Sequence, residues 1–347
     1  MTIFDLVRAP EIASYWQEMT QDAPPYLGET LFPPQKKLGL NLSWLKGKKG
    51  LPVALKLSAF DVKAVPRQRI GMEKMATDMP FFKESMYVDE ELRQELNKVM
   101  ESGNSMYIDA VMNRIFDDST TLLEAARVAR ERMRMQLITT GEISLASNGQ
   151  AYDYDYGLDA STQKVDAATA WTNNNADIIG DIRGWQDAIE DATGIRPNRA
   201  VCSRKTWSYM LKNLPIKKTL AVLSDGTEYL SDARLRTYLA EELDLTVTIY
   251  SKRFMNDSGV AAKYIPDDTF ILLPPGNLGN TWFGTTPEES DLMSSSTVEN
   301  VAIVDTGVAV TTMKQSDPVN VEIKVTQICL PDFPTADQIV IADVTPA

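Results

Sequence analysis

The sequence predicts an α+β fold, and three observations lead to this prediction. Helical periodicity runs through residues 105–137. Strand-like alternation marks residues 36–88 and the region after residue 298, and a mixture of helices and strands lies between. Helices and strands that occupy separate stretches of a chain are typical of this class. The 347 residues, 44% hydrophobic and 24% charged, suffice for one large domain or two medium ones.

Residues 1–35 predict an arm that cannot build a core alone. A short helix is expected from Ala9 to Met19, with Pro10 suited to its first turn. Pro24-Pro25 and Pro33-Pro34 then break the chain into extended segments, because proline lacks a backbone donor and restricts the residue before it. We expect the arm to lie across its own body or across a neighbouring subunit.

The strongest local charge lies between Lys36 and Lys74, which we call the basic segment. This segment contains ten basic and two acidic residues, which gives it a net charge of +8. Because the whole chain carries −13, the residues outside the segment carry −21. The basic residues are Lys36, Lys37, Lys46, Lys48, Lys49, Lys56, Lys63, Arg67, Arg69 and Lys74.

Alternation in LPVALKLSAFDVKAV and MPFFKESMYV predicts a long two-stranded hairpin with its tip near Pro66 to Thr77. A lone hairpin is marginal in water, so we expect it to lie on another surface, guided by opposite charge. The alternatives are a basic surface loop, or one that binds nucleic acid by stacking on its aromatic residues. Nucleic-acid binding is disfavoured because the basic residues are spread along strands and the rest of the chain is acidic.

Residues 89–140 predict helix. From Ser105 to Leu137 the helix would be about 50 Å long at about 1.5 Å per residue, far above the mean length of roughly 12 residues. Four arginines are expected in its last turns, where cations complement the negative helix end. They are Arg127, Arg130, Arg132 and Arg134. The alternative is two ordinary core helices with a basic C-terminal face.

Residues 141–347 predict mixed α and β structure. An amphipathic helix from Ala176 to Thr193 is closed by Gly194. Further helices are expected at Lys205–Asn213 and Ser231–Leu243, and strands at Arg199–Ser203, Thr246–Tyr250, Phe270–Leu273, Val298–Met313, Val319–Cys329 and Gln338–Ile341. The turn Gln315–Pro318 indicates an antiparallel hairpin between the two longest strands.

The residues that most enzymes use are missing. The chain has no histidine, which removes Ser-His-Asp and Cys-His catalysis and nearly all catalytic zinc sites. No GxxxxGK[ST] or GxGxxG phosphate loop occurs. Cys202 and Cys329 are expected to be buried reduced thiols, with a disulfide as the less favoured alternative. We predict no catalytic residue, no metal and no cofactor.

Carboxylate side chains gather in two places along the sequence, and metal binding is a less favoured alternative for the first of them alone. Asp153–Asp159 superficially resembles a calcium loop, but Leu158 occupies the position of the loop glycine and no glutamate closes it. The alternation of Tyr and Asp there favours a half-exposed strand. Glu288–Asp291 is expected to be a solvated surface run. No run of about 20 apolar residues and no secretory signal is seen, so we expect a product that stays in the cytoplasm.

The order of the predicted parts is similar to that of a known protein family. The parts are an arm, a charged hairpin, a long helix, a mixed region and a closing β-hairpin. The stretches concerned are TIFDLVRAPEIASYWQ, YLGETLFPPQKKLGLNLSWL, ARVARERMRMQLITTGEI, IRPNRAVCSRKTWSYML, FMNDSGVAAKYIPDDTFILLPPGNLGNTWFG, VEIKVTQICLPDF and IVIADVTPA. Together they resemble the major capsid proteins of tailed bacteriophages with the Hong Kong 97-type fold. Within that group the likeness is to the lambda-type capsid protein E family, and it covers essentially the whole chain.

The resemblance implies self-assembly into hexamers and pentamers of an icosahedral head shell that encloses phage DNA. It implies the following divisions: an N-terminal arm at 1–35, an extended loop at 36–88, a peripheral domain with the spine helix at 89–164, an axial domain at 165–297 and return strands at 298–347. It also implies inter-subunit contacts by the extended loop, for which the candidates are Lys56, Lys63, Arg67, Arg69 and Lys74. Arg127, Arg130 and Arg134 would form the basic face of the spine helix.

The implied partners are other copies of the chain, a separate scaffolding protein, a portal and, as an optional partner, a decoration protein. DNA would be enclosed without sequence-specific binding, no membrane would be involved, and the protein would reach the virion after assembly in the host cytoplasm. Another phage structural protein, such as a tail or connector component, is the main alternative. An enzyme of unknown class and a nucleic-acid binder come after it.

Overall fold

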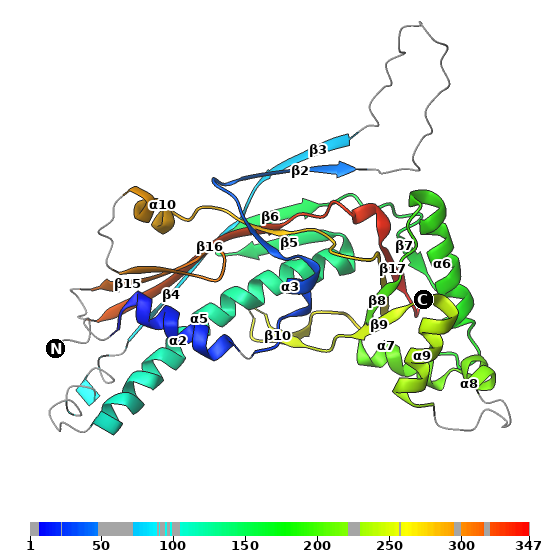
Figure 1. The fold of residues 1–347 in the computed structure, drawn as a ribbon, viewed down its shortest axis with the longest axis horizontal. Coiled ribbons are helices and arrows are strands. Elements are labelled where there is room, and N and C mark those ends of the chain that lie inside the picture. The colour runs from blue at the N-terminus through cyan, green and yellow to red at the C-terminus, as the bar shows by residue number, and fades with distance from the viewer. Residues whose placement is uncertain are drawn as a thin grey trace, which may run out of the picture. The chain divides into compact units, whose positions relative to one another are not determined.

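The structure is a computed structural model of residues 1–347 (Figure 1). The residues it describes are 7–21, 23–47, 72–88, 90, 94–95, 98, 105–220, 230–256, 258–294, 300–315 and 320–346, with the backbone alone at 44–47, 72–76 and 105–109. The chain divides into two compact units. The first contains Met1–Leu42, Ala76–Arg132 and Asn280–Asp332, and the second Ser43–Met75, Met133–Gly279 and Phe333–Ala347.

A six-stranded sheet forms the base of the first unit. Its order is β1-β13-β16-β15-β14, with β4 also paired to β16. The strands are β1 (Pro34–Lys36), β4 (Phe81–Tyr87), β13 (Thr281–Phe283), β14 (Val301–Val304), β15 (Val308–Lys314) and β16 (Val321–Pro331). β16 is central: β15 lies along one side, and β4 and then β13 lie along the other. Only the β1–β13 pair among these is parallel.

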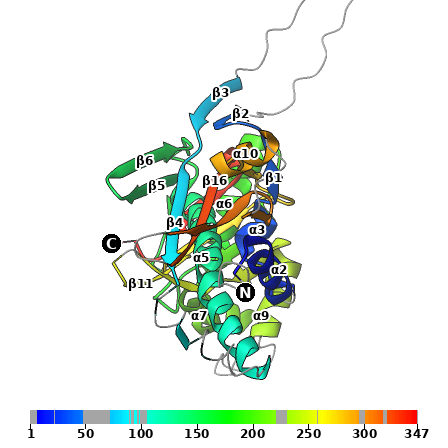
Figure 2. The same cartoon turned by 90° about the vertical axis from the view of Figure 1, so that its left-hand side faces the viewer.

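Helices cover the two faces of this sheet. They are α2 (Ala9–Thr20), α3 (Leu27–Leu31), α10 (Pro287–Ser294) and the first part of α5 (Ser105–Thr140). The alternation of side chains along β16 decides which helix each residue meets. Gln327 donates to the Ala126 carbonyl of α5, whereas Thr326, one residue earlier, donates to Glu288 of α10. α5 therefore lies on one face, beside β4 and β16 (Figure 2), and α10 on the other.

The N-terminal arm lies on its own body. Ile12 and Trp16 of α2 are almost fully buried, and the Tyr15 hydroxyl donates to Asp117 of α5 at 2.6 Å. The predicted helix at residues 9–19 is confirmed. α3 was not predicted, because the flanking prolines suggested extended chain. A reciprocal capping contact between Tyr26 and Glu29 allows this single turn to form.

The prediction for residues 36–88 needs two corrections. β2 (Asn41–Gly47) and β3 (Met72–Asp78) form a separate two-stranded sheet, so Met72–Thr77 belongs to a strand and not to the tip. The MPFFKESMYV strand does not pair within that hairpin, because β4 pairs antiparallel with β16. Pro80 lies between β3 and β4 and cannot donate a ladder hydrogen bond, which separates the two pairings. Residues 48–71 lie outside the described part of the chain.

The long helix is confirmed, and it runs to Thr140. Gly141 follows with φ of 79°, in the left-handed region that ends many helices. The expectation that the arginines occupy the last turns is wrong, because the last turn contains no basic residue. Arg134 is the arginine nearest to the end, and Met135 to Thr140 continue the helix beyond it.

The second unit is built on a five-stranded mixed sheet of order β7-β17-β12-β8-β9. The strands are β7 (Lys164–Asp166), β8 (Arg199–Cys202), β9 (Thr246–Ile249), β12 (Thr269–Leu273) and β17 (Val340–Asp343). Its helices are α6 (Ile178–Thr193), α7 (Arg204–Lys212), α8 (Leu214–Leu220), α9 (Asp232–Leu243) and the 3₁₀ turn η1 (Ala336–Gln338). Trp171, Trp207 and Phe270 lie in its hydrophobic core. These helices and strands confirm most of the predicted elements, including the closure of α6 by Gly194 at φ 75°.

Two hairpins of the second unit join no larger sheet among the described residues. They are β5 (Glu142–Ser147) with β6 (Gln150–Asp155), and β10 (Arg253–Met255) with β11 (Ala261–Lys263). β6 confirms the strand predicted from the alternation of Tyr and Asp. β5, β10 and β11 were not predicted, because each is short and flanked by polar residues.

The strand predicted at Val298–Met313 is two strands, β14 and β15. They form a hairpin that turns at Asp305, whose φ of 49° is left-handed. The Asp-Thr-Gly sequence at this turn supplies residues that tolerate such backbone angles. The predicted antiparallel pairing of the last long strands is confirmed by β15 and β16, while residues 316–319 of their turn lie outside the described part.

Both cysteines are free and buried, as predicted. Within the described residues, none of the helices is both long and apolar enough to cross a bilayer.

Candidate functional site

The predicted contact residues of the basic segment can be placed only in part. Lys56, Lys63, Arg67 and Arg69 lie outside the described residues, and Lys74 lies on β3 with its side chain also outside them. Their role in contacts between subunits therefore stays a prediction.

Lys36, the first residue of the basic segment, has a defined place in the first unit. Its Nζ donates to the Gly284 carbonyl at 2.9 Å and to Glu289 at 2.5 Å. Glu289 belongs to α10, and its neighbour Glu288 on that helix pairs with Lys324 of β16 at 2.7 Å. The expectation that these glutamates form a solvated run is wrong, because their side chains are only 11% and 13% exposed.

The environment of Glu288 explains why α10 stays on the sheet. Burial by itself raises the pKa of this carboxyl, but hydrogen bonds from Lys324 and Thr326 outweigh burial and hold the pKa below its usual range. Glu288 thus remains charged, and its charge-assisted hydrogen bonds hold α10 against β16. A short helix that buries no apolar side chain of its own depends on such contacts.

Arg127 binds the N-terminal arm. Its guanidinium lies 5.9 Å from the Trp16 ring centre and 5.1 Å from that of Tyr26, and it pairs with Glu29 at 3.4 Å. Cation–π contacts with two rings and an ion pair together hold α2 and α3 against α5. Only 11% of the Arg127 side chain is exposed.

Arg130 and Arg134 are also turned inward. Arg130 donates to Gln327 at 2.9 Å and to Asp305 at 2.7 Å, and Arg134 is 1% exposed. The structure therefore places the three predicted arginines of the spine helix in buried or nearly buried positions. Glu124, Glu29 and Asp305 are partners that sequence reasoning missed. Glu124 and Arg127 are three residues apart, the spacing of a helical ion pair, which is a signal that could have found Glu124. Glu29 and Asp305 are too distant in the sequence for such a signal.

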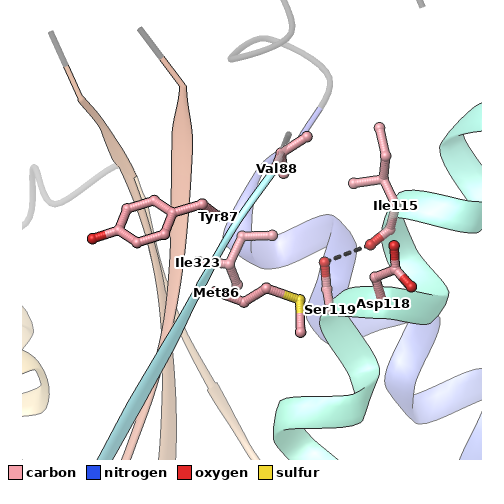
Figure 3. Close-up of a pocket in the computed structure, with 7 residues that line it drawn as sticks. All are labelled: Met86, Tyr87, Val88, Ile115, Asp118, Ser119 and Ile323. Atoms are coloured by element: carbon pink, nitrogen blue, oxygen red, sulfur yellow. Dashed lines mark hydrogen bonds between the residues drawn. The ribbon is translucent and has the colours of Figure 1, made fainter. Parts of the chain in front are cut away.

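A small pocket opens between the sheet and α5 in the first unit, with a volume of about 50 Å³. Figure 3 shows Met86 and Ile323 on the strand side and Ser119 on the helix side, while Tyr87 points away from the helix. The Ser119 hydroxyl donates to the Ile115 carbonyl at 2.6 Å. A cavity of this size is far smaller than the 300–1,000 Å³, roughly, of ligand sites, so it is a packing gap.

The remaining polar and thiol side chains have contacts typical of structural residues and not of catalytic ones. Lys205 and Tyr209 both donate to Asp268, at 2.8 and 2.7 Å. The hydrogen bond to Asp268 raises the pKa of Lys205 above its usual range, so the amine stays protonated and is a poor nucleophile. Burial raises the pKa of the Cys202 thiol to about 12. Within the described residues, no group of three or more acidic or cysteine side chains could hold a metal ion.

A comparison with family models decides the family. The model described as phage major capsid protein E matches residues 9–344. The chain belongs to the phage major capsid protein E family. The role of this capsid protein is to form the capsid shell of a bacteriophage, and its place is the virion capsid. A search of curated proteins found no match.

Solved structures show the same fold. The putative capsid protein of a prophage of E. coli CFT073 has a TM-score of 0.60 at 16% identity, covering 97% of this chain and 99% of that one. A phage-related protein from Bordetella bronchiseptica RB50 has a TM-score of 0.57 at 14% identity, covering 98% and 100%. The capsid asymmetric unit of cyanophage A-1(L) has a TM-score of 0.51 at 12% identity, covering 93% and 94%. The capsid protein therefore has the Hong Kong 97-like fold predicted from its sequence.

Proposed function

We propose that this capsid protein closes into an icosahedral shell of hexamers and pentamers around phage DNA, and that its basic segment reaches over a neighbouring subunit. The charge distribution carries this proposal: +8 between Lys36 and Lys74 against −21 elsewhere. The separate β2–β3 sheet supports it, because a lone two-stranded ribbon gains stability by lying on another surface. Opposite charges on neighbouring copies fix the register of that contact.

The divisions follow from the same proposal. Along the sequence, residues 1–35 serve as the arm, 36–88 as the extended loop, 89–164 as the peripheral domain, 165–297 as the axial domain and 298–347 as return strands. The compact units differ from these divisions, notably at two strands, because β13 lies in the sheet of the first unit and β17 in that of the second. α5 is the spine helix. Buried pairing of Arg127 and Arg130 supports a rigid spine, since both residues fix neighbouring segments to it.

We infer no catalytic role. Assembly takes place in the host cytoplasm with a separate scaffolding protein and a portal, and a decoration protein is an optional partner. DNA is enclosed without sequence-specific contacts, because the acidic body repels phosphate.

Reversal of three basic residues tests the proposal. We expect R67E/R69E/K74E to leave the chain folded by circular dichroism but to reduce the yield of closed shells at least tenfold by electron microscopy. The control is K212E/K218E/R253E, which reverses three exposed basic residues of the second unit and should assemble normally. Wild-type yields from the first variant would refute the role of the basic segment. Rings or tubes from the wild-type chain would refute the closed shell.

A further inference from the structure

The β5–β6 hairpin is an unusually exposed element. Of residues 142–155, Ile143 is buried and Leu145 and Tyr154 are half-buried, while the rest are exposed. The two strands join no larger sheet among the described residues. The Ile143 side of the hairpin is packed within its own chain, and the opposite side is open to solvent. That open side is where another surface can cover the hairpin.

The register of this hairpin places like charges opposite each other. Glu142 pairs directly with Asp155, and Ser144 with Asp153. These positions share one side of the hairpin, because directly opposite residues point to the same face. We call Glu142, Asp153 and Asp155 the acidic face. Like charges directly opposite are destabilising, so the hairpin gives up stability to display this face.

Contacts within the chain offset the negative charge of the acidic face only weakly. Lys164 approaches Glu142 at 3.4 Å, but both side chains are about half exposed, at 42% and 56%, and such surface pairs contribute little. Asp155 accepts a hydrogen bond from the Gly157 amide. Among the described residues, Lys164 is the one basic side chain that pairs with the acidic face.

The spacing of the acidic face suits a row of cations and not a metal ion. Asp153 and Asp155 are two residues apart on one strand, which separates them by about 6.8 Å at roughly 3.4 Å per residue. No group of three such side chains in the described residues converges on a point that could hold a metal. The basic segment also has basic residues two positions apart in the sequence, Lys46 with Lys48 and Arg67 with Arg69.

We propose that the acidic face of β5–β6 is the surface on which the basic segment of a second copy of this chain docks. This proposal rests on the proposed function and adds the receiving surface to it. Charge complementarity selects the occupant: the basic segment carries +8, and the acidic face repels nucleic acid. The stacked pair Tyr152 and Tyr154, with ring centres 6.2 Å apart on the other side of the hairpin, stiffens the ribbon that presents the charges.

Charge exchange in the full-length chain tests this docking. We expect E142K/D153K/D155K to reduce shell yield at least tenfold, and the control D166K/D191K/E241K, at exposed positions of the same unit, to assemble normally. Combination of the hairpin reversal with R67E/R69E/K74E should restore yield to within about threefold of wild type. A hairpin effect that arose only from misfolding would show no such restoration.

The outcomes separate the two proposals. If R67E/R69E/K74E assembles normally, the proposed role of the basic segment is wrong, and the receiving surface with it. If that variant fails to assemble while the hairpin reversal assembles normally, the receiving surface is wrong and the proposed function stands. Failure of both single reversals without restoration in the combined variant also overturns the receiving surface.

Disulfide trapping gives a second, independent readout. Ser144→Cys, at the centre of the acidic face, is combined in turn with Lys63→Cys, Arg67→Cys and Arg69→Cys. We expect at least one pair to give intermolecular disulfides in assembled particles on a non-reducing gel, and Ser258→Cys in place of Ser144→Cys to give none. The native Cys202 and Cys329 do not compete, because both are buried. Particles in which none of the pairs forms a disulfide would overturn the docking.

Discussion

Arg130 carries a full positive charge into the interior of the first unit. Its side chain is 4% exposed, and its guanidinium lies 5.5 Å from the Phe283 ring centre. Burial of a charge is costly unless the group is paired and hydrogen-bonded. Asp305 supplies the pairing charge and Gln327 the second acceptor, so this residue joins α5 to β16 and to the β14–β15 turn.

We expect Arg130→Met to lower the free energy of unfolding of the unassembled chain by about 2–4 kcal/mol, because it leaves two polar groups without their donor. Urea unfolding followed by circular dichroism measures this change. Arg114→Met is the control, at an exposed position of the same helix, and should stay within about 0.5 kcal/mol of wild type. Equal losses in both variants would contradict a special role for Arg130.

At the scale of elements, short backbone signals decide where helices and strands end. α5 stops at Gly141, with φ of 79°, and the β5–β6 hairpin turns at Asn148 and Gly149, with φ of 51° and 76°. Two residues with positive φ form the turn that matches the twist of a hairpin. The Asn-Gly pair is thus a hairpin signal that can be seen in the sequence. The alternation of Tyr and Asp predicted β6 but gave no prediction for β5.

A pair of glycine substitutions tests the role of the helix end. We expect Gly141→Ala to destabilise the chain by about 1–3 kcal/mol, because its φ is unfavourable for alanine and its new methyl would meet Leu158. Gly184→Ala is the matched variant: it lies inside α6 with open space around it and should stabilise by about 0.5–1 kcal/mol. Thermal unfolding of both variants reports the two signs, and a stabilised Gly141→Ala would contradict this account.

At the scale of the whole molecule, charge is separated along the chain. The basic segment carries +8 and the remainder −21, so the proposed contact between copies would bring opposite charges together. Electrostatic attraction of this kind guides encounter and register more than it adds net affinity.

Assembly is therefore expected to depend on salt. An increase in ionic strength from about 0.1 to 1 M shortens the Debye length from roughly 10 to 3 Å. We expect the initial rate of assembly to fall on the order of tenfold. Light scattering follows the rate, with sucrose at matched osmolality as the uncharged control. A rate that rises with salt would indicate that apolar burial, and not charge, guides the encounter.

Local pattern predicted much of the fold. The long helix, α6, α7, α9 and the closing β15–β16 hairpin follow from periodicity and end signals that lie within each element. The prediction failed where pairing is non-local: β4 pairs with β16, some 240 residues later. Nothing within MPFFKESMYV distinguishes a partner in its own hairpin from a central strand elsewhere, since the alternation suits both.

The sequence by itself determined the family-like order of elements, the absence of histidine chemistry and the separation of charge, because these depend on residue identity and spacing alone. Only the tertiary structure decided where the charged side chains lie. Arg127 was expected on a basic helix face and Glu288 in a solvated run, yet Arg127 holds the arm and Glu288 holds α10. The physical reason is that the free energy of a charge depends on its partners and its exposure, which folding sets.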